Sequence, residues 1–298
     1  MRSMAWAILG LWSMVCGVTE AADPVQAVSS PPISVVAAGD IADCGSDGLL
    51  FPNAFRTADL VAPSDTVVLT LGDNTYPVGA PAEFANCFQA TWGRFKERIR
   101  PSPGNHDYMT TDADAYFDYF GAAAGPDRRG YYSVDAGGWH FISLNSNADA
   151  GVGSAQYAWL QADLAANSET LCALAYWHHP VFSSGPHGNN PHMSELLKLL
   201  HAAGAEIVLV GHDHIYERFA PQDAAGNADP ERGVRFFTVG TGGARLYSLR
   251  APKPNSEVRD ASTHGVLRLT LAASDYRWAF VPADGSAPRD EGSAACHR

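Results

Sequence analysis

Five separate segments of this chain present aspartate, asparagine or histidine at the point where predicted structure stops. These residues are Asp40, Asp73, Asn105, His178 and the run His212-Asp213-His214. Taken singly, each is a common turn, cap or surface residue. In open α/β sheets, however, ligand sites lie at the carboxyl ends of strands. Carboxylate, amide and imidazole groups without thiolate suit metals that prefer oxygen and nitrogen ligands. The repetition therefore predicts one metal site assembled from five segments.

The chain between these positions alternates apolar runs with amphipathic stretches. Strands are predicted at 33–38, 66–71, 130–134, 139–144, 171–177, 206–210, 234–239, 266–271 and 276–281. Helices are predicted at 49–61, 154–166 and 194–203, and over part of 83–98. The alternation indicates a layered α/β architecture in one domain, because no Pro/Gly/Ser linker divides it. Polar loops are predicted at 221–232 and 250–263, and a tail at 284–295.

The first 21 residues have the pattern of a signal peptide. Arg2 precedes an uncharged run at 5–18, and small residues follow at 21–22. The run is shorter than the roughly 18 apolar residues that a membrane span needs, although an uncleaved anchor is the alternative. We therefore expect a signal peptide at 1–21, a lead-in segment at 22–32 and a single domain at 33–298. The expected location is secreted or periplasmic, with no membrane contact after signal removal.

The charge balance limits the class of partner. The chain has 20 Lys and Arg against 32 Asp and Glu, a formal net charge of −12. This balance disfavours nucleic acid as a stable partner and disfavours an anionic membrane surface. It leaves a small phosphorylated substrate open, because a metal supplies positive charge locally.

Four cysteines remain after signal removal, and an exported chain meets an oxidising compartment. They are Cys44, Cys87, Cys172 and Cys296, which allow three connectivities. A bridge between Cys172, at the start of a predicted strand, and Cys296, near the C-terminus, would hold a tail that has few other contacts. Cys44–Cys87 then follows by elimination. The alternative is that one or more of the four are free thiols.

The ordered motifs resemble the calcineurin-like metallophosphoesterase superfamily, and within it the purple acid phosphatase branch of the secreted bacterial type. The motifs are Asp40, Gly72-Asp73, Gly104-Asn105-His106-Asp107, His178 and Gly211-His212-Asp213-His214. Many superfamily members place a ligand histidine two residues after the first aspartate, where this chain has Ala42. Purple acid phosphatases lack that histidine and carry a tyrosine, as at Tyr76 here. The resemblance implies a four-layer α/β/β/α sandwich of two mixed β-sheets flanked by helices.

The resemblance also implies a centre of two metal ions. One ion, expected to be Fe³⁺ because a phenolate favours a trivalent ion, is bound by Asp40, Tyr76 and His214. The other, Fe²⁺, Zn²⁺ or Mn²⁺, is bound by Asn105, His178 and His212. Asp73 bridges the two ions.

The implied reaction is attack of a metal-bound hydroxide on phosphorus, with a histidine protonating the leaving oxygen. His106 and His187 are the two candidate proton donors, although His187 is equally well explained as a solvated loop residue. Asp107 is expected to orient a neighbouring group. His179 is expected to point away from the metals, because neighbouring strand residues face opposite ways.

The sequence thus predicts a phosphatase that hydrolyses phosphomonoesters. The alternatives are a phosphodiesterase or nucleotide hydrolase on the same metal centre and, in another class, a metal-binding module without turnover.

Overall fold

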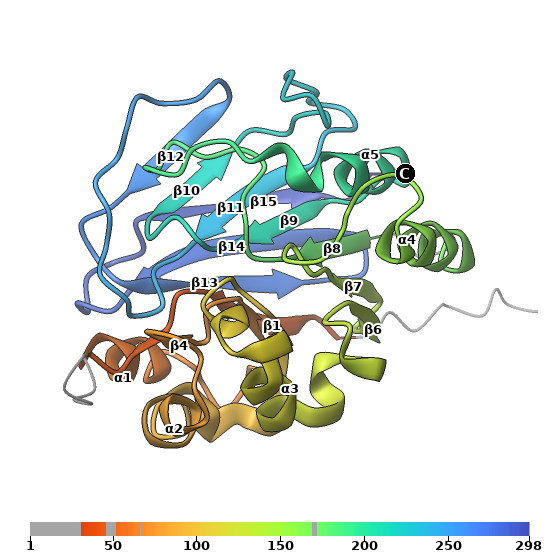
Figure 1. Cartoon of the computed structure of the whole chain (residues 1–298). Helices are drawn as coiled ribbons and strands as arrows, with labels where there is room; N and C mark the ends of the chain where they lie inside the picture. Colours follow the sequence, from red (N-terminus) through yellow and green to blue (C-terminus); the bar gives the residue numbers. More distant parts are fainter. Residues whose placement is uncertain (1–30, 46–51, 66, 169–171, 298) are drawn as a thin grey trace, which may run out of the picture.

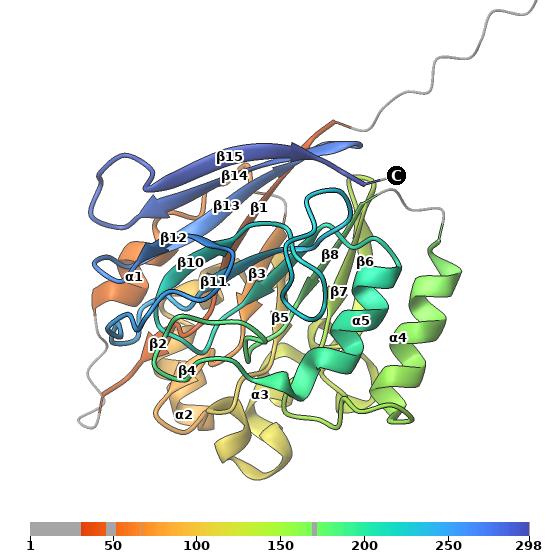
Figure 2. The same cartoon turned by 90° about the horizontal axis from the view of Figure 1, so that it is seen from above.

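The apolar runs predicted as strands form the centres of two mixed β-sheets that pack face to face (Figures 1 and 2). The computed structural model describes residues 31–45, 52–65, 67–168 and 172–297. The predicted signal peptide at 1–21 lies outside the described residues, as does most of the lead-in segment. Among the described residues no helix is both long and apolar enough to cross a membrane.

The first sheet has six strands in the order β15-β14-β13-β1-β3-β5. They are β1 (Ile33–Ala38), β3 (Val67–Leu71), β5 (Ile99–Ser102), β13 (Gly265–Leu271), β14 (Asp275–Pro282) and β15 (Asp290–Ala295). Strands β1, β3 and β5 are parallel neighbours, whereas β13, β14 and β15 are antiparallel. The carboxyl ends of the three parallel strands therefore meet at one edge of this sheet.

The second sheet has seven strands in the order β12-β10-β11-β9-β8-β7-β6. They are β6 (Tyr132–Ala136), β7 (Trp139–Ser143), β8 (Cys172–Tyr176), β9 (Ile207–Val210), β10 (Tyr216–Phe219), β11 (Arg235–Val239) and β12 (Ser256–Asp260). Strands β7, β8, β9 and β11 are parallel. A short parallel pair, β2 (Ala42–Asp43) and β4 (Thr75–Tyr76), continues the contact between the chain beyond β1 and the chain beyond β3.

Helices cover the outer faces of the two sheets. The α-helices are α1 (Pro52–Ala58), α2 (Pro81–Glu83), α3 (Asp114–Phe120), α4 (Ala155–Ala166) and α5 (Ser194–Ala202). A π-helix covers Phe84–Phe88, and 3₁₀ turns cover Trp92–Arg98, Asp107–Met109, Thr111–Ala113, Gly121–Ala124, Pro126–Arg128 and Pro191–Met193. Helices α4 and α5 lie side by side along the seven-stranded sheet, whereas α1, α2 and α3 lie on the far side of the molecule (Figure 1).

The alternation of side chains along β9 explains the layers. Ile207 and Leu209 belong to the large apolar cluster that fills the space between the sheets. Val208 and Val210 point the other way and pack in a second cluster with Leu196 and Leu200 of α5. Because this strand is buried on both faces, it reads as a continuous apolar run, as expected for a central parallel strand. The predicted four-layer α/β/β/α sandwich is confirmed.

Several short or polar elements differ from the sequence predictions, and strands β2, β4, β5 and β10 have no predicted counterpart. The predicted loop at 250–263 contains strand β12, and the predicted tail at 284–295 contains strand β15, which pairs with β14. Both strands lie at sheet edges and expose many of their side chains, so they lack the apolar signal. Helix α3 was not predicted. Within the predicted helix at 49–61, the structure describes a helix that begins at Pro52; residues 49–51 are outside the described part.

Two disulfides join segments that are distant in sequence. Cys44 is bonded to Cys87, with 5.8 Å between their Cα atoms, and Cys172 to Cys296, with 5.7 Å. Both predicted pairs are therefore confirmed. The second bridge lies next to β15 and holds the end of the chain against the start of β8.

Candidate metal centre

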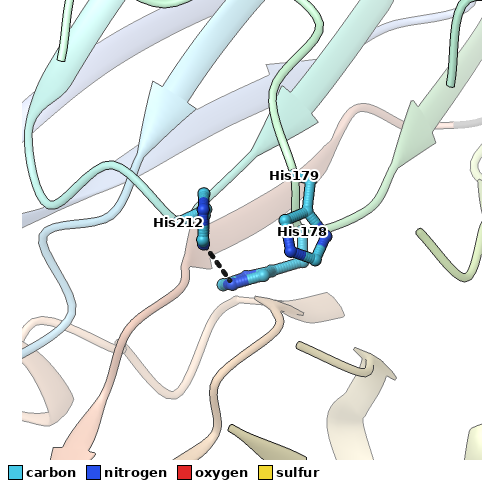
Figure 3. Close-up of side chains that lie close together, drawn as sticks. All are labelled: His178, His179 and His212. Carbon is cyan, nitrogen blue, oxygen red and sulfur yellow. Dashed lines mark hydrogen bonds between the residues drawn. The ribbon is translucent and has the colours of Figure 1, made fainter. Parts of the chain in front are cut away.

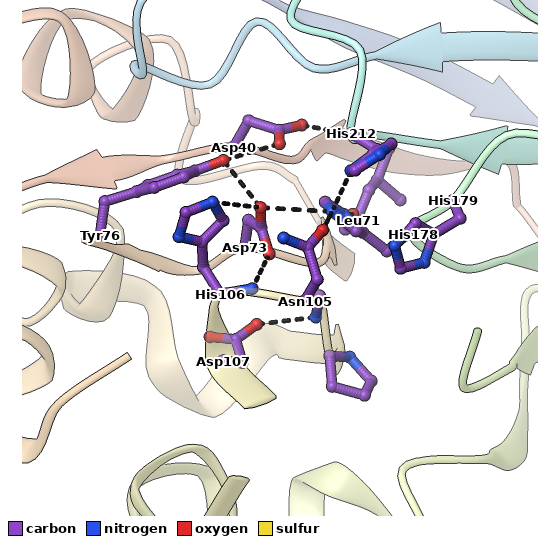
Figure 4. A network of polar contacts seen from close by, with 12 residues as sticks. Asp40, Leu71, Asp73, Tyr76, Asn105, His106, Asp107, His178, His179 and His212 are labelled. Atoms are coloured by element: carbon purple, nitrogen blue, oxygen red, sulfur yellow. Dashed lines mark hydrogen bonds and ion pairs between the residues drawn. The ribbon is translucent and has the colours of Figure 1, made fainter. Parts of the chain in front are cut away.

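Two sets of parallel strands place the polar residues at one edge of the sandwich. Asp40 follows β1, Asp73 follows β3 and Asn105 follows β5, three neighbours in the six-stranded sheet. His178 follows β8, and His212 and His214 follow β9, two neighbours in the other sheet. Figure 4 shows side chains from both sheets turned toward one another. The structure thus brings together the five segments from which the sequence predicted one site.

The backbone at this edge adopts conformations that L-residues seldom take. Asp40, Asp73 and His212 have positive φ values of 59°, 48° and 69°. Left-handed backbone at non-glycine residues is sparsely populated and gathers at functional sites. A Cβ atom on Gly104 would lie 2.1 Å from Oδ1 of Asp73, so only glycine leaves room for this carboxylate. These turns are therefore shaped to aim particular side chains inward.

The first group of side chains consists of Asp40, Tyr76 and His214. The Tyr76 hydroxyl lies 2.8 Å from Oδ1 of Asp40 and 3.1 Å from Nε2 of His214. Nδ1 of His214 donates to the carbonyl oxygen of Arg245 at 2.7 Å, so Nε2 is the nitrogen that faces the group. A backbone carbonyl on one ring nitrogen is the usual device that orients the other toward a metal.

The second group consists of Asn105, His178 and His212. Nε2 of His178 lies 3.0 Å from Oδ1 of Asn105 and 3.2 Å from Nδ1 of His212. Nδ1 of His178 donates to the carbonyl oxygen of Leu71 at 2.8 Å. The imidazole of His178 therefore also presents Nε2 toward its neighbours, in the same manner as His214.

Asp73 lies between the two groups. Its Oδ2 is 2.9 Å from the Tyr76 hydroxyl, in the first group, and 3.3 Å from Nε2 of His178, in the second. Its Oδ1 accepts a hydrogen bond of 2.8 Å from the backbone N–H of His106. One oxygen thus faces both groups while the other is fixed by the backbone.

The donor set fits positively charged ions. Asp40 and Asp73 are buried. Each carboxylate accepts one backbone N–H, and its other oxygen faces the Tyr76 hydroxyl and an imidazole nitrogen. Burial and the two carboxylates raise the pKa of Tyr76 well above its usual value. Burial lowers the pKa of His178, but the charge of Asp73 more than offsets this and raises it to about 9. Carboxylate, phenol and imidazole groups so arranged are suited to exchange protons for metal ions.

His179 lies closer to the centre than the sequence predicted. Its ring centroid is 4.5 Å from that of His212 and 4.9 Å from that of His178. The three side chains are drawn together in Figure 3, and they form one of the two groups in the described residues with metal-ligand spacing. Nδ1 of His179 lies 2.8 Å from the hydroxyl of Ser146, which limits the ring to its other nitrogen. The expectation that His179 points away from the metals is therefore wrong.

The two histidines predicted as proton donors lie against different ligand groups, His106 against Tyr76 and His187 against His212. Nδ1 of His106 bonds to the carbonyl oxygen of Pro77, and its Nε2 is 3.9 Å from Oδ2 of Asp73. The ring of His187 stacks on that of His212 with centroids 4.1 Å apart. His187 is thus an integral part of the cluster and not a free loop residue, even though its side chain is 44% exposed.

Asp107 lies beneath the centre and touches none of the predicted metal ligands through its carboxylate. It accepts hydrogen bonds from the backbone N–H of Gly104 at 2.8 Å and from the side chain of Asn74 at 3.0 Å. Burial and the charge of Asp73 raise its pKa to about 7. Its carboxylate ties together the loops that carry Asp73 and Asn105.

Sequence reasoning missed the groups that hold the histidines. The carbonyl oxygens of Leu71 and Arg245 have no side-chain signature, so no motif could reveal them. Tyr247, whose ring stacks on His214 with centroids 4.0 Å apart, lies in a loop with no recognisable pattern. Asp213 did have a signal, because it stands between two predicted ligands, but its contact with His187 was not predictable from the sequence.

Comparisons with known proteins agree with this geometry. The family model described as calcineurin-like phosphoesterase matches residues 28–216. Purple acid phosphatase 21 of Arabidopsis thaliana is 32% identical over 253 residues, which cover 74% of this chain and 57% of that protein. Purple acid phosphatase 18 of the same plant is 31% identical over 232 residues, covering 69% of this chain and 52% of that protein. The chain thus spans little more than half the length of these relatives.

A solved structure shows the same fold. The purple acid phosphatase PPD1 from yellow lupin (Lupinus luteus) seeds superimposes with a TM-score of 0.75 at 18% sequence identity. The match covers 90% of this chain and 54% of that one. At this identity the likeness concerns the fold alone, and it extends over both sheets.

Proposed function

Because the chain belongs to the calcineurin-like phosphoesterase family, we propose that it is an exported binuclear-metal phosphatase that hydrolyses phosphomonoesters. The observation that carries the proposal is the position of Asp73, whose Oδ2 faces Tyr76 at 2.9 Å and His178 at 3.3 Å. A single carboxylate oxygen between two separate donor groups is what a pair of neighbouring ions requires. The similarity to purple acid phosphatases supports a phosphoric ester as the substrate.

The residues present divide into two ligand sets around Asp73. Asp40, Tyr76 and His214 would hold one ion, for which we propose Fe³⁺. Asn105, His178 and His212 would hold the other, for which we propose Fe²⁺, Zn²⁺ or Mn²⁺. When bound, such a pair supplies an acidified water as nucleophile and positive charge for the phosphoryl oxygens.

The histidines beside the ligands can move the proton that hydrolysis needs. His106 has its Nδ1 fixed by Pro77, and so its Nε2 faces Asp73 and the space in front of it. His187 has its Nδ1 fixed by Asp213 and rests on the ring of His212. When protonated on both nitrogens, either ring can give the hydrogen on Nε2 to a departing alkoxide and keep the one on Nδ1. General acid catalysis of this kind contributes about 10²- to 10⁴-fold.

A phosphodiesterase or nucleotide hydrolase on the same centre is the second reading of the ligand set. A metal-binding module without turnover is the third, and the two oriented histidines argue against it because metal retention has no need of them. The proposed substrate remains a small phosphorylated molecule.

Export is the part of the proposal that rests on the sequence and the cysteines. Both described disulfides are of the kind that persists in oxidising compartments. N-terminal sequencing of the mature protein from culture medium or periplasm tests it, with cleavage near residue 21 as the expected result. A full-length chain in the cytoplasmic fraction would contradict it.

The central experiment combines metal analysis with a panel of phosphoesters. We expect two ions per chain and faster hydrolysis of mono-nitrophenyl phosphate than of bis-nitrophenyl phosphate. The reverse preference would favour the phosphodiesterase. Two bound ions without turnover of any ester in the panel would leave the metal-binding module.

A further inference from the structure

The loop Ser183–His187 is fastened to one buried carboxylate, that of Asp213. The hydroxyl of Ser183 donates to Oδ2 of Asp213. The backbone N–H of His187 donates to Oδ1 at 3.1 Å, and Nδ1 of the same histidine lies 2.9 Å from that oxygen. Asp213 has no exposed surface. A buried carboxylate that accepts two bonds from one histidine determines both where its backbone lies and how its ring is turned.

The loop at Gly185 passes close to the side chain of Asp213. A Cβ atom on Gly185 would lie 2.3 Å from the carboxyl carbon of Asp213, so the loop passes directly over the carboxylate. The backbone of Asp213 is itself held, since Gly211 accepts its N–H at 2.9 Å. Asp213 lies between His212 and His214, which are fixed as described above. The carboxylate is therefore a fixed hydrogen-bond acceptor for the backbone and ring of His187.

The contact with Asp213 also selects the tautomer of His187. An ionised carboxylate only accepts hydrogen bonds, so Nδ1 of the neutral ring carries the hydrogen. Nε2 is then the bare nitrogen, and among the described residues it has no hydrogen-bond partner. The ring stacks on His212 at an interplanar angle of 30°, which keeps Nε2 beside the proposed metal centre.

A second carboxylate holds the same loop without touching His187. The backbone N–H of Ser184 donates to Oε2 of Glu217 at 2.8 Å, and its hydroxyl donates to Oε1. The Ser184 hydroxyl also accepts the backbone N–H of Lys253 at 2.9 Å. The loop thus has two independent fastenings, of which one reaches the imidazole and the other does not. A substitution at Asp213 therefore affects the orientation of His187, whereas one that weakens the Glu217 contact affects only the order of the loop.

We propose that Asp213 is a positioning residue that keeps Nδ1–H of His187 on the carboxylate and Nε2 toward the leaving oxygen, so that the ring protonated on both nitrogens gives up the hydrogen on Nε2 and is left as the Nδ1–H tautomer. The catalytic half of this statement rests on the function proposed above, whereas the tautomer does not. Asp213 acts only through His187. Its loss should consequently have no effect where His187 is already absent.

The kinetic test compares Asp213→Ala, His187→Ala and the double variant, each with metal content measured. Esters with poor leaving groups need a proton in the transition state, and those with good leaving groups do not. We expect Asp213→Ala and His187→Ala each to slow an alkyl phosphate by about 10²-fold, with much smaller effects on an activated aryl phosphate. The double variant should be no slower than His187→Ala. The matched control is Ser184→Ala, which weakens the Glu217 fastening and should leave the leaving-group dependence unchanged.

A direct measurement keeps the proposal testable if a variant fails to fold or if the protein hydrolyses no phosphoester. Long-range ¹H–¹⁵N NMR spectra of the zinc-loaded wild-type protein distinguish protonated from bare ring nitrogens. We expect the Nδ1–H form for His187 and a mixture of forms in Asp213→Ala. An Nε2–H tautomer in the wild type would overturn the proposal, as would losses from Asp213 and His187 that add in the double variant. Absence of all phosphoester hydrolysis, with the expected tautomer present, would sink the proposed function and leave the positioning contact standing.

Discussion

Nδ1 of His178 donates a 2.8 Å hydrogen bond to the carbonyl oxygen of Leu71, 107 residues earlier in the chain. Leu71 ends β3 in the six-stranded sheet, and His178 follows β8 in the seven-stranded one. The bond therefore crosses between the sheets at the edge where the candidate ligands gather. A change in how the sheets pack would move His178 relative to Asp73, and so metal affinity reports on the packing of the whole sandwich.

Asp73→Asn should weaken metal binding at both positions, whereas Asp40→Asn should weaken it at one. The reason is that Oδ2 of Asp73 faces both ligand groups. Among the described residues, the carboxylate of Asp40 has polar contacts with Tyr76, His214 and the backbone of His212, and none with the second group's side chains. Metal analysis after equilibrium dialysis measures the number of ions retained by each variant. Two tightly bound ions in Asp73→Asn would remove the bridging role.

Tyr76→Phe should abolish the visible colour of the iron-loaded protein. Burial and the charges of Asp40 and Asp73 hold the pKa of Tyr76 well above its normal value, so only a strongly charged ion produces a phenolate there. A ferric phenolate has a charge-transfer band, and absorption spectroscopy of the oxidised protein detects it. Phenylalanine preserves the ring contact with His106, so a loss of colour in this variant reports the missing hydroxyl and not a change in packing.

A colourless wild-type protein that is fully loaded with iron in its oxidised form would contradict the phenolate. Tyr76 would then be a hydrogen-bond donor to the two carboxylates, and the first ion would be zinc or manganese. The iron content must be measured in the same sample, because an unloaded protein is colourless for a trivial reason.

Removing the Cys172–Cys296 bridge should destabilise the fold more than removing Cys44–Cys87. The bridges span 124 and 43 residues, and the entropy that a crosslink removes from the unfolded chain grows with loop length. Each double alanine variant should lose about 2–5 kcal/mol, with the longer loop costing about 1 kcal/mol more. Chemical denaturation of metal-free protein measures both. Equal losses would mean that the length of the closed loop does not determine what each bridge contributes.

His140 should give the fold a pH-dependent stability that is separate from the metal centre. Its Nδ1 lies 2.7 Å from Asp135 and its Nε2 lies 2.8 Å from Asp163, so the protonated ring satisfies both. Burial lowers the pKa of His140, but the two carboxylates more than offset this and raise it. A raised folded-state pKa gives stability that is complete below the unfolded value of about 6.5 and is lost as pH rises through the folded value.

The melting temperature of His140→Gln, compared with wild type, checks this expectation. The melting temperature of the variant should lie furthest below that of wild type near pH 5. The difference should shrink as the pH rises above 7. Asp163→Asn is the second variant to measure, because the side chain of Asp163 is only 11% exposed. The side chain of Asp135 is 69% exposed, so water screens its interaction with His140. A deficit independent of pH would show that His140 acts through packing alone.

The fold was predictable where strands are apolar and was missed where they are polar. β9 is buried on both faces and shows it in the run Ile207–Val210. β15 reads Asp-Glu-Gly-Ser-Ala-Ala and is a strand only because it pairs with β14, with Gly292 lying against the ring of Trp278. Such pairing depends on residues elsewhere in the chain. Local sequence therefore has no means of indicating it.

The candidate site divides in the same way. The proposed side-chain ligands, such as Asp73 and His178, have types and positions that a motif records. The orientation of His187 depends on Asp213, 26 residues away, and on a loop whose path is set by two buried carboxylates. Strand alternation predicts that His179 points away from the metals. The chain leaves β8 at Tyr176, so the alternation no longer applies at His179. Each miss comes from a contact that only the tertiary structure defines.

The pairing of β1 with β13 means that the six-stranded sheet cannot be completed until the C-terminal strands are available. Ile33 lies opposite Leu271 in that antiparallel pair, so the first strand lacks one neighbour until the chain is almost complete. Contacts of such large sequence separation form slowly, and unpaired strand edges attract other chains in the meantime. A nascent chain released from the ribosome before residue 271 would expose the edge of β1. We therefore expect truncated products to aggregate and not to accumulate as smaller active enzymes.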